Sequence, residues 1–100
     1  MIVYSVTVKI DLEVHQEWFS WMQKKHILDV LKTNKFVDYK MYKVLVDDET
    51  EGITYNVQYR ANTMNDYFDY LNDYAEVLQV EHGLKYKDKF VAFRTLLREV

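Results

Sequence analysis

The chain has 100 residues, of which 49% are apolar and 16% aromatic, and this composition predicts one folded domain over residues 1–100 rather than a disordered chain. The formal net charge is −3 with both signs interspersed, which argues against a nucleic-acid-binding surface. Cysteine is absent, which excludes disulfides, thiolate metal sites and cysteine nucleophiles and fits a reducing compartment.

The chain begins with a segment in which apolar and mixed residues alternate. One series consists of Ile2, Tyr4, Val6, Val8 and Ile10. This period of two predicts a strand with one strongly apolar face. The segment has neither a basic start nor a small-residue cleavage site, and no apolar run reaches the length of a membrane span. We therefore expect a soluble cytoplasmic protein with no membrane contact.

A helix is predicted to follow, with Asp11 as its N-cap and its end near Lys32. Asn34 is a suitable left-handed residue to terminate it. The apolar stripe that predicts the buried side of this helix consists of Val14, Trp18, Trp21, Met22, Leu28 and Leu31.

Two strands joined by an acidic turn are predicted next. Residues 36–46 are apolar on both faces, with Val37, Tyr39, Met41 and Leu45 on one and Phe36, Tyr42, Val44 and Val46 on the other. Residues 47–52 form the turn. In the returning strand, 53–61, apolar residues alternate with hydrogen-bonding residues, so only one of its faces is suited to a core.

A second helix is predicted to begin at Thr63, which forms a capping-box pattern with Asp66. Asn72 and Asp73 indicate a kink, after which the apolar stripe continues to His82, with Gly83 near the end of the helix. The last strand, 89–98, carries apolar side chains on both faces and one arginine, Arg94, in its middle.

This order of elements predicts an α+β, ferredoxin-like βαββαβ sandwich, with a four-stranded antiparallel sheet and two helices on one face. The first and third strands are then central, which leaves Ser5, Thr7, Asn56 and Gln58 on the open face. The two edge strands are apolar on both sides, and a monomer would expose that surface. We therefore expect a homodimer whose sheets face each other as a dimeric α+β barrel.

Several segments together are similar to one known family. They are Met1-Ile2-Val3-Tyr4-Ser5-Val6-Thr7, Trp18 with Trp21-Met22, His26-Ile27, Tyr55-Asn56-Val57-Gln58-Tyr59 and Phe90-Val91-Ala92-Phe93-Arg94-Thr95. This set resembles the family named domain of unknown function (DUF) 4286 over nearly the whole chain. The resemblance implies a small bacterial protein of the dimeric α+β barrel type, a class that also includes small quinone-forming monooxygenases, lactone isomerases and haem-degrading enzymes. It brings no mechanism with it.

Arg94 is the first candidate site residue, because a guanidinium on a strand can hold a carboxylate or phosphate with two hydrogen bonds. The competing interpretation is a structural ion pair with a protein carboxylate at the dimer interface. Gln58 and Tyr59 are the other residues that we expect to contact a ligand.

No catalytic residue is assigned, although His26 is a weak candidate for a general acid or base because the pKa of histidine lies near neutrality. It could equally be a structural histidine on the flank of the helix. The spacing of His15, His26 and His82 matches no zinc motif, so neither a metal nor a cofactor is expected.

The leading hypothesis is a homodimeric domain that binds a small organic ligand or another protein without catalysis. The alternative is a cofactor-independent enzyme, similar to a monooxygenase or isomerase, that acts on a small aromatic or carbonyl compound. In that case His26 would carry a proton and Arg94 would hold an anionic oxygen. RNA binding is not expected, because Tyr55 and Tyr59 are predicted to face the helices rather than the open face. A cavity reached by both His26 and Arg94 would favour the enzyme.

Overall fold

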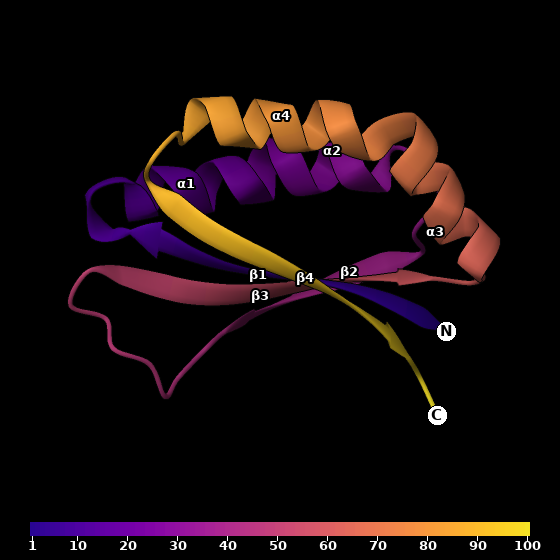
Figure 1. Cartoon of the computed structure of the whole chain (residues 1–100), viewed down its shortest axis with the longest axis horizontal. Helices are drawn as coiled ribbons and strands as arrows, with labels where there is room; N and C mark the ends of the chain where they lie inside the picture. The colour runs from indigo at the N-terminus through magenta and orange to yellow at the C-terminus, as the bar shows by residue number, and fades with distance from the viewer.

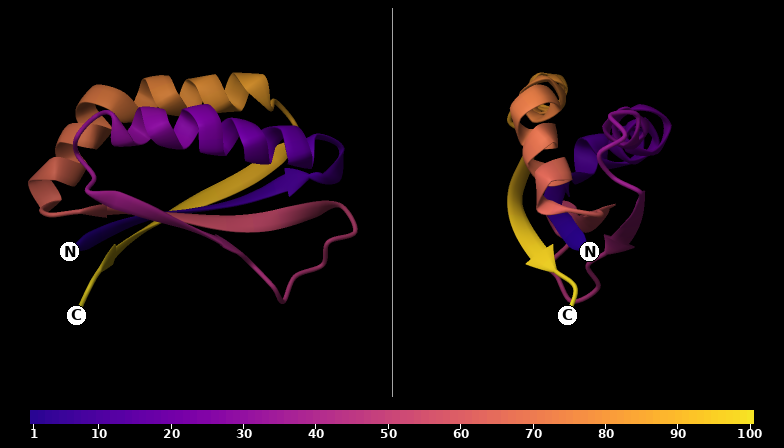
Figure 2. Two further views of the ribbon diagram at one scale, coloured as in Figure 1. Left: turned by 180° about the vertical axis from the view of Figure 1, so that it is seen from behind. Right: turned by 90° about the vertical axis from the view of Figure 1, so that its right-hand side faces the viewer.

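The computed structural model describes residues 1–100 as an antiparallel sheet covered on one face by two helical segments (Figure 1). The strands are β1 (Ile2–Asp11), β2 (Asp38–Lys43), β3 (Gly52–Ala61) and β4 (Phe90–Arg98), in the spatial order β2-β3-β1-β4. Both helical segments lie on the same side of the sheet in the two views of Figure 2. The predicted ferredoxin-like βαββαβ fold is therefore confirmed, with β1 and β3 central.

Each helical segment contains a π turn, in which the backbone takes about one extra residue per turn. The first segment runs through η1 (Leu12–Val14), α1 (His15–Trp21), the π turn η2 (Met22–His26) and α2 (Ile27–Leu31). The second runs through α3 (Met64–Tyr70), the π turn η3 (Leu71–Ala75) and α4 (Glu76–Lys85). The chain bends between α3 and α4, where the sequence predicted a kink (Figure 1).

The π turn η2 corrects the predicted buried side of the first helix. Trp18 and Met22 are buried as expected, but beyond the turn Ile27 and Val30 are buried and Leu28 is 43% exposed. The extra residue rotates everything after it by about 100°, the angle that one residue takes in a helix. Counted from Met22, the α-helical positions four and seven residues on are His26 and Asp29, and the extra residue moves the buried positions to Ile27 and Val30.

Three predicted helix termini are at the expected positions, although Asp11 makes no side-chain cap. Asn34 has a φ of 62°, as the left-handed residue that ends the first helix. Thr63 accepts a hydrogen bond from the Asp66 backbone N–H (3.1 Å) as an N-cap. Asp11 is the N-cap residue of η1, but its carboxylate accepts no capping hydrogen bond; it is also the last residue of β1, and its backbone N–H donates to the Lys89 carbonyl (2.9 Å).

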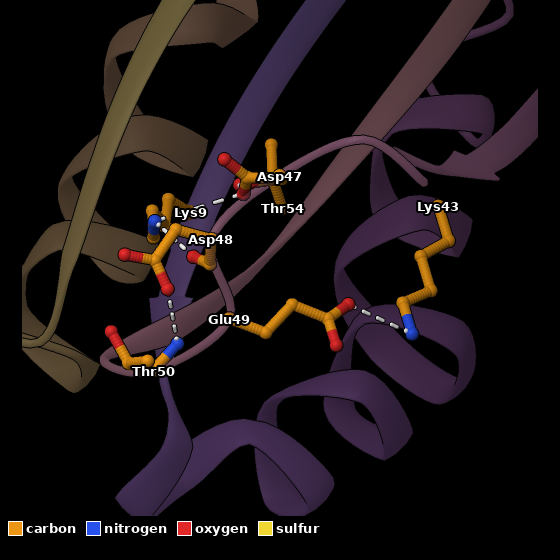
Figure 3. Close-up of polar contacts among 7 residues, drawn as sticks. All are labelled: Lys9, Lys43, Asp47, Asp48, Glu49, Thr50 and Thr54. Carbon is orange, nitrogen blue, oxygen red and sulfur yellow. Dashed lines mark hydrogen bonds and ion pairs between the residues drawn. The ribbon is translucent and has the colours of Figure 1, made fainter.

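Strand β2 is shorter than predicted: it ends at Lys43, and the last backbone hydrogen bond to β3 runs from the Val44 N–H to the Thr54 carbonyl (2.9 Å). The following turn bends beneath the sheet, where Lys9 donates to the Asp48 carbonyl (2.8 Å) and Lys43 pairs with Glu49 (3.0 Å) (Figure 3). Val46 is therefore exposed rather than part of a strand. Phe36, predicted as the first residue of this strand, precedes β2 and packs in the core against Tyr59.

The open face of the sheet is polar at its centre, as predicted. The Asn56 amide donates to the hydroxyls of Ser5 (2.8 Å) and Thr7 (3.0 Å). Gln58 lies on the same face, since it is opposite Ser5 in the β1–β3 register. No helix of the chain has the length and apolar character that crossing a bilayer requires.

The two glycines allow a matched test of this packing. A Cβ on Gly52 would lie 2.6 Å from the Ile10 carbonyl oxygen, so Gly52→Ala should destabilise the protein by about 1–3 kcal/mol. A Cβ on Gly83, within α4, meets no atom within 4 Å, so Gly83→Ala should stabilise by up to about 1 kcal/mol. Urea denaturation measures both values. A neutral Gly52→Ala would contradict the close approach of β3 to β1.

Candidate functional site

A cavity of about 40 Å³ lies between the sheet and the helices. Its walls are mostly apolar, and its polar lining residues are Tyr4, His26, Tyr59, Tyr70, Gln79, His82 and Arg94. Space of this size holds about two or three water molecules, or a group of a few non-hydrogen atoms. The helix-facing side of the sheet is therefore not completely filled by the core.

Arg94 reaches the cavity from the edge strand β4, where it is opposite Val6 of β1. Its Nε donates to the Tyr4 hydroxyl (3.0 Å), and Gln79 approaches the same hydroxyl from α4 (3.5 Å). None of the ion pairs of the chain involves Arg94, in contrast to Arg60, which pairs with Asp38 (2.8 Å) and Glu99 (3.0 Å). The Arg94 guanidinium thus carries an uncompensated positive charge at the cavity.

Two histidines face each other across the helices, His26 from the π turn η2 and His82 from α4, with ring centroids 5.6 Å apart. The Trp18 indole N–H donates to His82 Nε2 (2.9 Å). Because an indole can only donate, His82 Nε2 is unprotonated and its neutral ring carries hydrogen on Nδ1. His26 Nδ1 is buried without a hydrogen-bond partner.

Burial keeps both imidazoles neutral at physiological pH. It lowers the pKa of His26 to about 4, although the nearby Glu81 and Asp29 carboxylates oppose the shift. It also lowers the pKa of His82 to about 4, and the charges of His26 and Arg94 act in the same direction. A neutral imidazole with a free nitrogen can accept a proton or donate a hydrogen bond, depending on its tautomer.

Two phenols of the cavity, those of Tyr59 and Tyr70, stay protonated. Burial raises the pKa of Tyr59 well above its usual value, and the neighbouring phenols of Tyr70 and Tyr4 raise it further. Burial likewise raises the pKa of Tyr70, although the Arg94 charge opposes this shift. Neither hydroxyl is hydrogen-bonded to a protein group. Both hydroxyls are therefore available as hydrogen-bond donors.

The structure brings three of the residues singled out from the sequence to this cavity, namely Arg94, Tyr59 and His26. Gln58 lies on the opposite face of the sheet, because it is adjacent to Tyr59 in a strand. His15 is bonded to the Tyr55 hydroxyl (2.7 Å), away from the other two histidines. No group of three or more His, Asp or Glu side chains is arranged to hold a metal ion.

Sequence reasoning did not assign Tyr4, Tyr70, Gln79 or His82 to a ligand site, although all four line the cavity. One signal was present: Tyr4 and Tyr59 both belong to the apolar faces of the central strands, and the register places them opposite each other. The convergence of Tyr70, Gln79 and His82 depends on the bend at η3, which sequence spacing does not describe.

A family model described as "Domain of unknown function (DUF4286)" matches residues 1–100. The chain belongs to the DUF4286 family. The resemblance seen in its sequence motifs is thereby confirmed, over the full length. No curated protein matches this DUF4286 chain.

Solved structures share the fold of this DUF4286 protein at low sequence identity. An ethyl tert-butyl ether D (EthD) family protein from Bacillus halodurans has a TM-score of 0.68 at 14% identity, with 100% of both chains covered. A dimeric ferredoxin-like protein from an uncultured marine organism has a TM-score of 0.58 at 17% identity, covering 99% of this chain and 97% of that one. SnoaB, a cofactor-independent oxygenase from Streptomyces nogalater, has a TM-score of 0.61 at 10% identity, covering 98% and 92%. At these identities the likeness establishes the fold alone.

The buried histidines predict a loss of stability in mild acid. Below about pH 6.5 the unfolded chain binds protons that the folded histidines, with pKa values near 4, do not accept. The free energy of unfolding should therefore be full above pH 6.5 and fall by up to about 3 kcal/mol for each histidine as the pH approaches 4. Urea denaturation between pH 4 and 7 measures this loss. In His26→Gln, only the part of the loss that His82 contributes should remain. A flat profile would contradict the burial of neutral imidazoles.

Proposed function

We propose that this DUF4286 protein is a homodimer that binds a small organic ligand in the cavity between its sheet and its helices. The observation that carries this proposal is Arg94, which lines the cavity without a carboxylate partner from its own chain. Of the residues selected from the sequence, Arg94 and Tyr59 would contact the ligand. Gln58 would lie between the two sheets of the dimer.

The requirements of a guanidinium support binding at this position. A guanidinium that borders an apolar cavity is stabilised there by a charged or polar acceptor. No carboxylate of the chain pairs with Arg94, and Glu81, the carboxylate that acts on His26, pairs with Lys25 through Oε2 (3.4 Å). The Tyr4 hydroxyl satisfies only Nε of Arg94 and leaves the two terminal nitrogens without a protein acceptor. A ligand oxygen would supply what the chain does not.

The exposed apolar side of the sheet supports the homodimer. Val91 and Phe93 of β4 are 69% and 63% exposed, and Leu97 is exposed on the same face. The 44–51 turn and the C-terminus both project on this side of the sheet, and they border the open face at its two ends (Figures 1 and 2). A second copy would bury the apolar residues, and a structural neighbour is itself described as a dimeric ferredoxin-like protein. A bacterial, cytoplasmic origin belongs to the same proposal and agrees with the lack of cysteine.

An enzyme is the second candidate, and His26 is the observation that favours it. Its Nδ1 has no partner, its ring is neutral, and it lines the same cavity as Arg94. His26 would carry a proton while Arg94 holds an anionic oxygen of a small aromatic or carbonyl substrate. The fold is shared with SnoaB, a cofactor-independent oxygenase, which makes this candidate an analogy with a specific geometric basis.

Dimer formation can be tested by substitutions that introduce a charged side chain on the open face. Phe93→Asp should convert a dimer to a monomer at micromolar concentration in multi-angle light scattering, because a carboxylate would be buried against an apolar partner surface. Val80→Asp, a similarly exposed position on α4, should leave the dimer intact. A wild-type monomer at this concentration would defeat the proposal for the open face.

Ligand binding is tested by native mass spectrometry of freshly purified protein, which should show a small molecule bound to the wild type and none bound to Arg94→Ala. The variant should stay folded and lose only about 1 kcal/mol, because its one hydrogen bond to Tyr4 is the contact removed. If Arg94→Ala unfolds the dimer, the arginine is structural. If His26→Gln keeps the ligand but abolishes its turnover, the enzyme candidate is supported.

A further inference from the structure

The polar groups around the cavity are strongly biased toward hydrogen-bond donors. The hydroxyls of Tyr59 and Tyr70 donate to no protein acceptor. The Tyr4 hydroxyl accepts from Arg94 and Gln79, which leaves its own hydrogen free. With the terminal nitrogens of Arg94, three phenols and one cation therefore lack acceptors.

The cavity has few acceptors of its own. Its lining contains no carboxylate, and the only acceptors among its side chains beyond the hydroxyls are the Gln79 amide oxygen and imidazole nitrogens. One of these, His82 Nε2, is already occupied by Trp18. The phenols of Tyr59 and Tyr70 remain protonated, so they cannot supply a negative charge. The site is thus positively charged and is poorly suited to a cationic ligand.

We propose that the ligand is a small carboxylic or enolic acid, whose anionic oxygens accept hydrogen bonds from Arg94 and from the tyrosines of the cavity. This inference rests on the ligand-binding role proposed above and names the chemical class that the site recognises. Charge-assisted hydrogen bonds from a guanidinium to a carboxylate are among the strongest available to a protein. Phenol donors add to them without adding charge.

The size of the cavity sets how such a ligand enters. About 40 Å³ accommodates a carboxylate or enolate head of a few atoms but not an aromatic ring, since a cavity that binds benzene has about 150 Å³. The head therefore lies inside, among the tyrosines, and the rest of the molecule extends outward past Arg94, whose side chain is exposed. Charge at the head, rather than the shape of the remainder, should dominate recognition.

Two pairs of probes of matched shape test the charge requirement, namely acetate with acetamide and benzoate with benzamide. Titrations followed by NMR at the backbone amide resonances of β4, which Arg94→Gln retains, should show each carboxylate binding at least ten-fold more tightly than its amide. Arg94→Gln should remove most of this preference, whereas Tyr59→Phe and Tyr70→Phe should each weaken carboxylate binding several-fold. Arg98→Gln is the matched control, because Arg98 lies on the same strand and the same face of the sheet but does not line the cavity.

The outcomes separate this inference from the proposed function. If the amides bind as tightly as the carboxylates, or if a neutral ligand copurifies with the protein, the inference that the ligand is an acid is wrong. The proposed binding site would still stand. No binding of any probe and no copurifying ligand would overturn both. If Arg94→Gln weakens the dimer and not carboxylate binding, a carboxylate of the second copy occupies the guanidinium, and the inference is wrong. Should a tyrosine variant fail to fold, Arg94→Gln alone decides.

Discussion

The antiparallel pairing of β1 with β3, from Ile2 opposite Ala61 to Asp11 opposite Gly52, determines what every other element contacts. This register places Tyr4 opposite Tyr59 on the helix-facing side and Ser5 opposite Gln58 on the other. A slip of one residue would exchange the two faces and put phenols where the amide network now lies. The sheet side of the cavity and the polar centre of the open face follow from this pairing, and the register of β1 with β4 then places Arg94 opposite Val6.

Local signals were sufficient to predict most of the architecture. Alternation identified the central strands, because one face of each is buried and the other is not. Asn34 and Thr63 were recognised as helix boundaries because their roles depend on the residue and its immediate neighbours. The edge positions of β2 and β4 followed from the order of elements rather than from any residue.

The candidate site depended on features that sequence periodicity cannot represent. A π turn changes the period partway through a helix, so Leu28 was assigned to the buried stripe that Ile27 and Val30 occupy. The early end of β2 reflects long-range contacts of the following turn with Lys9, which lies on another strand. The grouping of Arg94 with Tyr4 and Gln79 joins residues from the two ends of the chain. The sequence shows the types of these residues but not that they lie close together in the fold.

Consecutive residues of β4 point to opposite sides of the sheet, so Arg94 lines the cavity while its neighbour Phe93 lies on the open face. The two side chains are therefore coupled through the backbone of one strand. In the proposed dimer, a shift of this strand that improves the contact of Arg94 with a ligand also moves Phe93 against the second subunit. Occupancy and self-association would then be thermodynamically linked, each altering the other by the same factor. The two sites of such an assembly would communicate without a separate regulatory element.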